Sequence, residues 1–211
     1  MITKIKQALG LGRGTPIDTS AQIIVDALQS CYRPARVVDV GCGDGTWLSK
    51  FRCHRTGLDR HSRDKIRIHS MDWYHRINFR NDWQMTRADL AICLEVAEHL
   101  WPADGANLVA KLCTAPVIVW SAAIPGQGGF GHVNEQWPSY WARLFAGHGY
   151  YPNLWLRNDL WHNHNILPWY HHIVIYTPVS YPRVELDIVH PRMANLKSFS
   201  RLCALLTLRR S

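Results

Sequence analysis

The most constraining feature of the chain is a short apolar run that turns abruptly into glycine. The residues Val37 to Val40 are mostly β-branched, and glycine follows at alternate positions, at Gly41, Gly43 and Gly45. A short apolar run of this kind is typical of a strand buried on both faces of a parallel sheet. Glycine lets the backbone approach a ligand where a Cβ would collide. The stretch therefore predicts an open α/β sheet with a nucleoside- or phosphate-binding corner at the end of this strand.

The spacing and the charge of this turn narrow its ligand. The third glycine comes one residue too early for the dinucleotide pattern G-x-G-x-x-G. Asp39, at the strand end, and Asp44, in the turn, would repel a pyrophosphate. An NAD-type oxidoreductase is therefore disfavoured, and a cationic or neutral nucleoside ligand fits better.

The stretch from Val37 to Thr46 resembles the first motif of the class I S-adenosylmethionine-dependent methyltransferases. The resemblance extends over about residues 18–178. It implies an α/β fold with a Rossmann-like, seven-stranded, mostly parallel, doubly wound sheet and an antiparallel last strand. It also implies an enzyme that uses S-adenosylmethionine. The cofactor-binding residues implied are Asp39, Gly41, Cys42, Gly43, Asp44, Gly45, Thr46, Asp59, Asp72 and Leu94.

Two acids later in the chain extend this donor site. Asp59 ends a predicted strand over 55–59 and follows Asp39 by 20 residues, the spacing of the ribose-binding acid in doubly wound folds. In the resembled family, the acid that ends the second strand binds the adenosyl ribose. Asp72 follows a predicted third strand over 65–69 and resembles the family's adenine contact. The alternatives are a helix-capping aspartate at position 59 and a loop acid at position 72.

A second group of polar residues follows the predicted fourth strand, 88–94. Glu95, Glu98 and His99 would share one face if a helix began there. A long glycine-rich loop over 122–136 would bring His132 to the same crevice. Two glutamates and two histidines can hold a divalent ion such as Mg²⁺ or Mn²⁺, which would bind acceptor hydroxyls and lower their pKa.

This constellation resembles those of two methyltransferase groups. One is the small-RNA 3′-terminal 2′-O-methyltransferases, and the other is the ubiquinone-pathway O-methyltransferases. The chain departs from the RNA enzymes because Leu100 stands where they have a second histidine, and no RNA-end-binding domain is recognisable. Glu-His after the fourth strand also occurs in members of the superfamily that bind no metal. His99 and His132 are therefore also candidates for a pocket-lining or catalytic-base role.

Periodicity and breaker residues predict the remaining elements. Asp18 or Thr19 would cap the first helix, and a helix of 46–51 would follow the glycine turn. Asp104 would cap a further helix. The segment 158–170 and the two histidines after it could roof the acceptor pocket or simply pack in the core. The other expected elements are a strand at 116–121, helices at 105–113 and 137–145, and strands at 151–157 and 171–177.

The chain is expected to comprise three parts, a basic N-terminal arm (1–17), a methyltransferase domain (18–178) and a basic C-terminal extension (179–211). The six cysteines form no C-x-x-C pair or framework spacing, which predicts a reducing cytoplasm and no structural zinc. No apolar run reaches the roughly 18 residues of a membrane span. The N-terminus also lacks the pattern of a secretory signal.

The formal net charge of +8 favours a polyanionic partner such as nucleic acid. Oxygen methylation of a hydroxylated small molecule, a sugar or an RNA end is the leading hypothesis. A noncatalytic nucleic-acid-binding protein on the same fold is the alternative. The intact glycine turn and Asp59 argue against it, because a dead enzyme has no need of a donor site. The sequence carries no signal for an oligomeric state.

Overall fold

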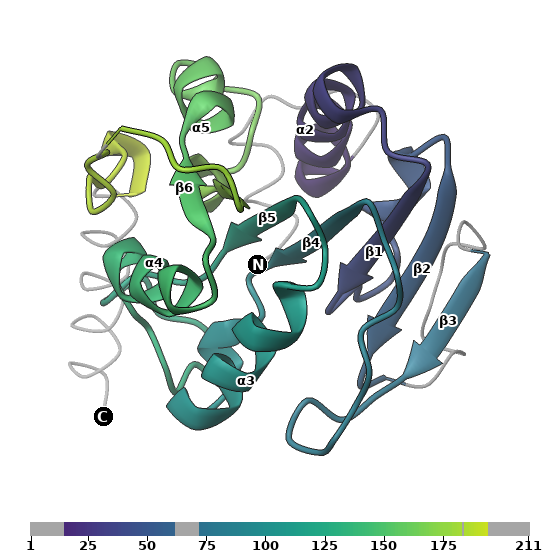
Figure 1. Cartoon of the computed structure of the whole chain (residues 1–211). Coiled ribbons are helices and arrows are strands. Elements are labelled where there is room, and N and C mark those ends of the chain that lie inside the picture. Colours follow the sequence, from purple (N-terminus) through teal and green to yellow (C-terminus); the bar gives the residue numbers. More distant parts are fainter. Residues whose placement is uncertain (1–14, 62–71, 183, 194–211) are drawn as a thin grey trace, which may run out of the picture.

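The computed structural model describes residues 15–61, 72–182 and 184–193 (Figure 1). Seven strands form one sheet in the order β3-β2-β1-β4-β5-β7-β6. Neighbouring strands are parallel from β3 to β5, whereas β7 is antiparallel to both β5 and β6. The predicted fold class is confirmed. The strands are β1 (Arg36–Val40), β2 (His54–Asp59), β3 (Trp73–Arg76), β4 (Leu90–Leu94), β5 (Ile118–Ser121), β6 (Tyr151–Asn153) and β7 (Val174–Thr177).

Helices cover both faces of this sheet. Figure 1 shows α2 and α5 on one face and α3 and α4 on the other. The chain runs outward from β1 to β2 and β3, then crosses back to β4 on the other side of β1. Such a reversal leaves a crevice at the carboxyl ends of the strands, where ligands bind in open α/β sheets. The helices are α2 (Pro16–Tyr32), α3 (Pro102–Leu112), α4 (Pro138–Gly147), α5 (Trp155–Leu160) and the 3₁₀ turns η1 (Leu48–Lys50), η3 (Ala97–His99) and η4 (Pro168–His172).

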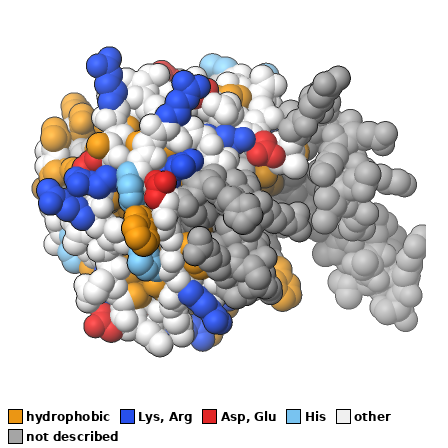
Figure 2. All heavy atoms as spheres, turned by 90° about the vertical axis from the view of Figure 1, so that its right-hand side faces the viewer, with side chains coloured by type: hydrophobic (Ala, Val, Ile, Leu, Met, Phe, Trp, Pro, Cys, Tyr) orange, Lys and Arg blue, Asp and Glu red, His pale blue; other side chains and the backbone are white. Residues whose placement is uncertain are grey.

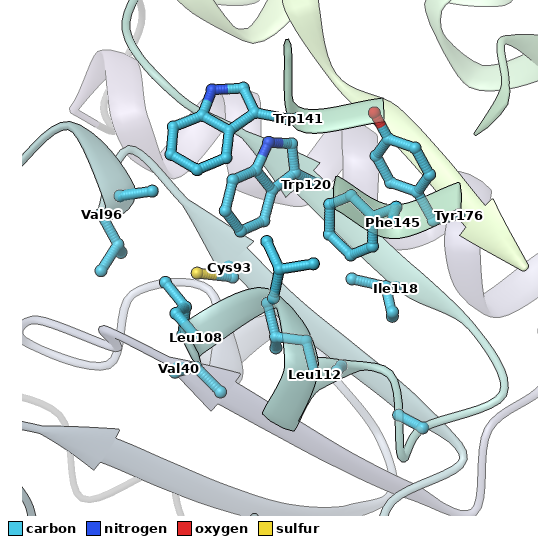
Figure 3. Packing of buried hydrophobic residues seen from close by; sticks show 14 of the residues in the cluster. Val40, Cys93, Val96, Leu108, Leu112, Ile118, Trp120, Trp141, Phe145 and Tyr176 are labelled. Atoms are coloured by element: carbon cyan, nitrogen blue, oxygen red, sulfur yellow. The ribbon is translucent and has the colours of Figure 1, made fainter. Parts of the chain in front are cut away.

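The core consists of two clusters, one on each face. Val38 belongs to the cluster under α3 and α4, and its neighbour Val37 belongs to the cluster under α2. Successive strand residues point to opposite faces, so the continuous apolar pattern of β1 is explained by burial on both sides. Figure 3 shows large aromatics filling the first cluster, where the rings of Phe145 and Tyr176 stack with centroids 3.9 Å apart.

Several predicted elements differ in their ends. The first helix is capped by Thr15, whose hydroxyl accepts from the Asp18 amide, because Pro16 takes the first helical position. Asp18 serves as the reciprocal member of this capping box and is not the cap itself. Similarly, α3 begins at Pro102, which places Asp104 in its first turn and not at the cap.

The connection after the glycine turn is shorter than predicted. In place of a helix of 46–51, only the 3₁₀ turn η1 forms before β2 begins at His54. The strand predicted at 151–157 ends at Asn153, whose side chain accepts from the amide of Trp155 and starts α5. The third strand predicted at 65–69 lies outside the described residues, and β3 is found later, at Trp73–Arg76.

The described part of the predicted C-terminal extension packs against the domain. Arg157 is 3% exposed and donates from Nη1 to the carbonyl of Leu186 at 2.9 Å. The amide of Ser139 donates to Asp187 at 2.8 Å, and Met193 is buried. Within the described ranges, none of the helices has both the length and the apolarity that a bilayer crossing requires.

Candidate functional site

A cavity of about 750 Å³ opens at the carboxyl ends of the strands that flank the crevice. It lies where the reversal of strand order predicts a ligand site. Its wall combines the glycine turn, the residues that follow β2 and β3, and the segment after β4. The lining residues are Gly41, Gly43, Asp59, Arg60, His61, Arg76, Ile77, Asn78, Phe79, Arg80, Glu95, Val96, His99 and Leu100.

The glycine turn is shaped by its backbone angles and by one close contact. Gly41, Gly43 and Gly45 all have positive φ, at 86°, 55° and 84°. A Cβ on Gly41 would lie 2.3 Å from the side chain of Val96, so only glycine fits there. The turn is fixed further by Asp44, which accepts from the amide and hydroxyl of Thr46 at 3.1 and 2.7 Å.

Asp59 joins the end of β2 to this turn. It is 5% exposed, and its Oδ2 accepts from the amide of Gly43 at 2.8 Å. Its Oδ1 accepts from the amide of His61 at 2.9 Å and lies 2.7 Å from the Nδ1 of the same residue. The structure therefore places Asp59 in the cavity wall beside the glycine turn, as the spacing from Asp39 predicts.

Asp39 lies beneath the turn and does not line the cavity. It is 2% exposed, and its Oδ2 has no hydrogen-bond partner among the described residues. Burial, with a smaller effect of Asp59, raises the pKa of Asp39 to about 8. Cys42 and Leu94, also predicted at the donor site, are buried in the core cluster under α2. Burial likewise raises the pKa of the Cys42 thiol above its usual range.

Asp72 is the predicted donor residue that the structure places elsewhere. It precedes β3 at the amino end of that strand, where it accepts from the Arg55 amide at 2.7 Å and pairs with the Arg55 guanidinium at 3.7 Å. The cavity lies at the carboxyl ends, so we leave Asp72 out of the candidate site. The shift of β3 instead brings Ile77, Asn78 and Phe79 into the cavity wall. The aromatic, strand-favouring pair Trp73-Tyr74 was the available signal for this position.

The segment after β4 differs from the predicted helix start. Glu95 adopts a left-handed backbone conformation with φ of 56°, and only η3 follows it. Both carboxylate oxygens of Glu95 are occupied, by the Ser121 hydroxyl at 2.8 Å and the Gln127 amide at 2.9 Å. Burial raises its pKa. Glu95 lines the cavity and lies near Glu98, but it is not one of the three residues whose ligand atoms lie within 4.8 Å of one another.

Glu98, His99 and His132 do converge. One ligand atom from each lies within 4.8 Å of the others, and the two imidazole rings meet edge to face at 4.9 Å. The loop that carries His132 is tied to η3, because the amides of Val133 and Asn134 donate to the Glu98 carbonyl at 2.8 and 3.1 Å. The long loop and the segment after β4 are thus one structural unit.

Both imidazoles are oriented through Nδ1. His99 Nδ1 lies 3.3 Å from the carbonyl of Gly131, and His132 Nδ1 lies 2.9 Å from the carboxylate of Glu135. A proton on each Nδ1 satisfies these acceptors and leaves each Nε2 with a free lone pair. Burial and the neighbouring charges of His132 and Arg60 lower the pKa of His99, although its contact with Gly131 opposes them. A neutral imidazole is the form that binds metals or accepts protons.

Glu135 is a site residue that sequence reasoning missed. Its carboxylate also accepts from the amides of Gly126 and Gly128, each at 2.7 Å. Burial alone would raise its pKa, but the hydrogen bonds from His132 and the two amides lower it. Glu135 therefore both shapes the loop and orients His132. Its spacing of three residues from His132 was the sequence signal that could have indicated a contact between the two side chains.

Glu98 is the unusual member of the group. It is fully buried, and neither carboxylate oxygen makes a hydrogen bond of ordinary distance and angle within the described part of the chain, although the Ala123 backbone and the Glu95 carboxyl lie close enough to affect its pKa. Burial, with the nearby Glu95 second, raises the pKa of Glu98 to about 9. A buried carboxyl group without partners is costly. One carboxylate and two Nε2 atoms fit a divalent ion, which would supply the missing partner.

The histidine-rich segment late in the chain does not reach the cavity. His171 and His172 are 1% and 3% exposed, and Tyr170 packs edge to face on Trp47 at 5.0 Å. These side chains belong to the core, which was one of the two interpretations that the sequence left open.

Comparisons with known proteins agree with this geometry. A family model described as a methyltransferase domain matches residues 18–154. The S-adenosylmethionine-bound structure of CalS10, an amino pentose methyltransferase from Micromonospora echinaspora, superposes with a TM-score of 0.55 at 16% identity, covering 85% of this chain and 97% of that one. The methyltransferase domain of bacterial CtHen1-C superposes with a TM-score of 0.53 at 16% identity, covering 75% and 98%. A search of curated proteins gave no match.

Proposed function

Because the chain belongs to the methyltransferase domain family and is an S-adenosylmethionine-dependent enzyme, we propose that it methylates a hydroxyl oxygen with the help of a divalent ion. The observation that carries this proposal is the fully buried carboxyl of Glu98, whose oxygens make no hydrogen bond of ordinary geometry, beside two imidazoles, of which His99 lines the donor cavity. Mg²⁺ and Mn²⁺ activate a hydroxyl without changing oxidation state, and both accept carboxylate ligands; the two imidazoles favour the transition metal Mn²⁺, since Mg²⁺ prefers oxygen ligands.

The donor would occupy the 750 Å³ cavity, with the glycine turn and Asp59 as its principal contacts. Gly41 and Gly43 present bare backbone there, and the ribose would lie against Asp59. Asp59 would have to exchange hydrogen bonds with the ribose hydroxyls, since both its oxygens already have partners.

The reaction itself asks little covalent chemistry of the protein. The acceptor oxygen attacks the methyl carbon, the carbon–sulfur bond breaks, and sulfur leaves as a neutral thioether. The hydroxyl proton must be removed, and the rest of the catalysis is positioning of donor and acceptor in line. When bound, the ion would lower the pKa of the acceptor hydroxyl.

The chain's own residues divide these tasks. Glu98, His99 and His132 would hold the ion, and Glu135 would keep His132 in the required tautomer. If no ion binds, the Nε2 atoms of His99 and His132 are the available proton acceptors. The acceptor remains a hydroxylated small molecule, a sugar or an RNA end. CalS10, which shares the fold, acts on an amino pentose by its name.

The test uses labelled S-adenosylmethionine with pools of hydroxylated acceptors, before and after chelation. We expect chelation to abolish transfer and Mn²⁺ or Mg²⁺ to restore it. Glu98→Gln should remove the metal response, whereas Glu185→Gln, which alters an exposed carboxylate outside the cavity, serves as the matched control. Full turnover in the presence of chelator would contradict the role of a metal ion. It would leave His99 and His132 as the candidate proton acceptors. Products methylated only on nitrogen or carbon contradict the hydroxyl acceptor.

A further inference from the structure

Three arginines line the donor cavity without acidic partners. Arg60 follows β2, Arg76 ends β3, and Arg80 follows four residues later. Within the described ranges, none of the three has a carboxylate within 4.0 Å, whereas Arg36 and Arg55 are paired with aspartates at 2.9 and 3.7 Å. Figure 2 shows basic side chains on the surface beside this edge of the sheet.

The wall holds two acids, Asp59 and Glu95, against three arginines, so it carries net positive charge even with both acids ionised. Asp59 is held by the Gly43 amide and by His61, and Glu95 by Ser121 and Gln127. Guanidinium groups stay charged at any physiological pH. The cavity is therefore a concave surface of positive charge, the kind of surface that concentrates anions.

The position of these arginines relates them to the reacting end of the cavity. Arg60 and Arg76 line the same cavity as His99 of the candidate metal group. Arg76 donates from Nε to the Arg60 carbonyl at 3.1 Å, which fixes its stem and leaves both terminal NH₂ groups for a ligand. Planar guanidinium forks held in this way match the oxygens of a phosphate.

S-adenosylmethionine does not account for three arginines, because its sulfur is a cation and its single carboxylate needs only one cationic partner. We propose that the acceptor carries a phosphate group, which Arg60 and Arg76 bind while its hydroxyl lies at the Glu98–His99–His132 cluster. This inference rests on the proposed hydroxyl methylation. A second cavity of about 510 Å³ shares Arg76, Ile77 and Asn78 with the first, and it offers space for the rest of a phosphorylated acceptor.

The first experiment measures anion binding without turnover, so that it does not depend on the metal or on the acceptor hydroxyl. Pyrophosphate and inorganic phosphate are titrated calorimetrically into the full chain saturated with S-adenosylhomocysteine and free of divalent ions. We expect Arg60→Gln and Arg76→Gln each to weaken pyrophosphate binding roughly tenfold, the loss of one charge-assisted contact. Arg87→Gln, which removes an exposed arginine outside the cavity, should change nothing.

The second experiment compares acceptors. Sugar phosphates and nucleoside monophosphates, with the corresponding free sugars and nucleosides as neutral counterparts, are offered with labelled donor. We expect transfer to the phosphorylated members, with KM raised in Arg60→Gln and kcat little changed.

Comparing the sugar phosphates with the nucleoside monophosphates identifies which class of acceptor carries the phosphate group. Anion binding that is unchanged in both arginine variants overturns the proposal, as does equal transfer to the neutral counterparts. If the arginine variants bind the donor more weakly but bind pyrophosphate unchanged, the proposal is also overturned. The arginines would then be assigned to the carboxylate of the donor.

Discussion

The His99–His132 pair and the His171–His190 pair both bring two imidazole rings into contact, with centroids 4.9 and 3.8 Å apart. The first pair meets edge to face beside the cavity, and each Nδ1 has an acceptor. The second pair is stacked in the core, and neither ring nitrogen of His171 has a partner among the described residues. Ring contact alone therefore does not distinguish a site from packing.

The difference lies in what surrounds each pair. A buried carboxyl, Glu98, lies within reach of the first pair, and His99 of that pair lines the cavity. The second pair has Arg192 and further histidines nearby, and burial lowers the pKa of His171 to about 3. An acid, an orienting acceptor and an open side are what turn a histidine pair into a candidate for chemistry.

The sharpest way to test this comparison is to change one residue at each pair. Glu98→Gln keeps the shape of the side chain but removes the only carboxylate of the first group, so we expect ion affinity and metal-dependent turnover to fall by about 100-fold or more. His171→Phe preserves an aromatic ring in the second pair and should leave both values unchanged. Metal titration and initial rates measure this contrast. Equal losses in the two variants would remove the distinction between the pairs.

The orienting acceptor of the first pair can be removed separately. Glu135→Gln keeps a side chain of the same size but can no longer accept a charge-assisted bond from His132 Nδ1. We expect ion affinity to fall about 10- to 100-fold, with turnover recovered at high ion concentration. Isothermal titration with Mn²⁺ and rates across an ion series measure both quantities. An affinity like that of the unaltered protein would mean that Glu135 only shapes its loop.

The fold and the donor corner were predictable because their signals are local. The β-branched run before Gly41 predicts a buried strand, and the spacing from Asp39 to Asp59 follows from the length of one strand–loop–strand unit. The apolar period of α2 and α4 likewise specified which elements form. Each of these features is decided within a few neighbouring residues.

The missed features depend on contacts between distant segments. Glu95 was grouped with Glu98 through a helix that does not form there, and the hydrogen bonds of its carboxylate to Ser121 on β5 and Gln127 in the loop follow from a left-handed backbone that the spacing did not predict. Asp72 was predicted to follow the third strand, whereas it precedes β3, at the amino end of that strand, and the position of this strand depends on its pairing with β2. The role of Glu135 depends on the amides of a loop whose conformation no local pattern specifies.

A milder change tests how closely the loop must approach His132. An added Cβ on Gly129 would lie 2.3 Å from His132 Nε2, so the ring would have to move from the position that faces Glu98. We expect Gly129→Ala to lower metal-dependent turnover by about tenfold, in line with the cost of displacing a positioned group. Gly147→Ala is the matched control, because its Cβ would meet nothing within 4 Å. Rates that stay equal in both variants would show that the ring tolerates the shift.

The His171–His190 pair should affect how the stability of the protein depends on pH. Because the folded-state pKa of His171 is lowered from 6.5 to about 3, by burial first and then by His190, Arg192 and His164, the unfolded chain binds a proton in this range that the folded chain does not. Stability from this group is complete above about pH 6.5 and is lost as the pH falls toward 3.

We expect the difference in Tm between pH 7.5 and pH 5 to be a few degrees smaller in His171→Phe than in the unaltered protein. Thermal unfolding followed by circular dichroism measures this, and His148→Phe, at an exposed histidine that ends α4, controls for a general change in titration. Parallel pH profiles for the unaltered protein and His171→Phe would mean that the core accommodates a charged imidazole. The two histidine pairs would then differ in access to ligands and not in the charge that their surroundings allow.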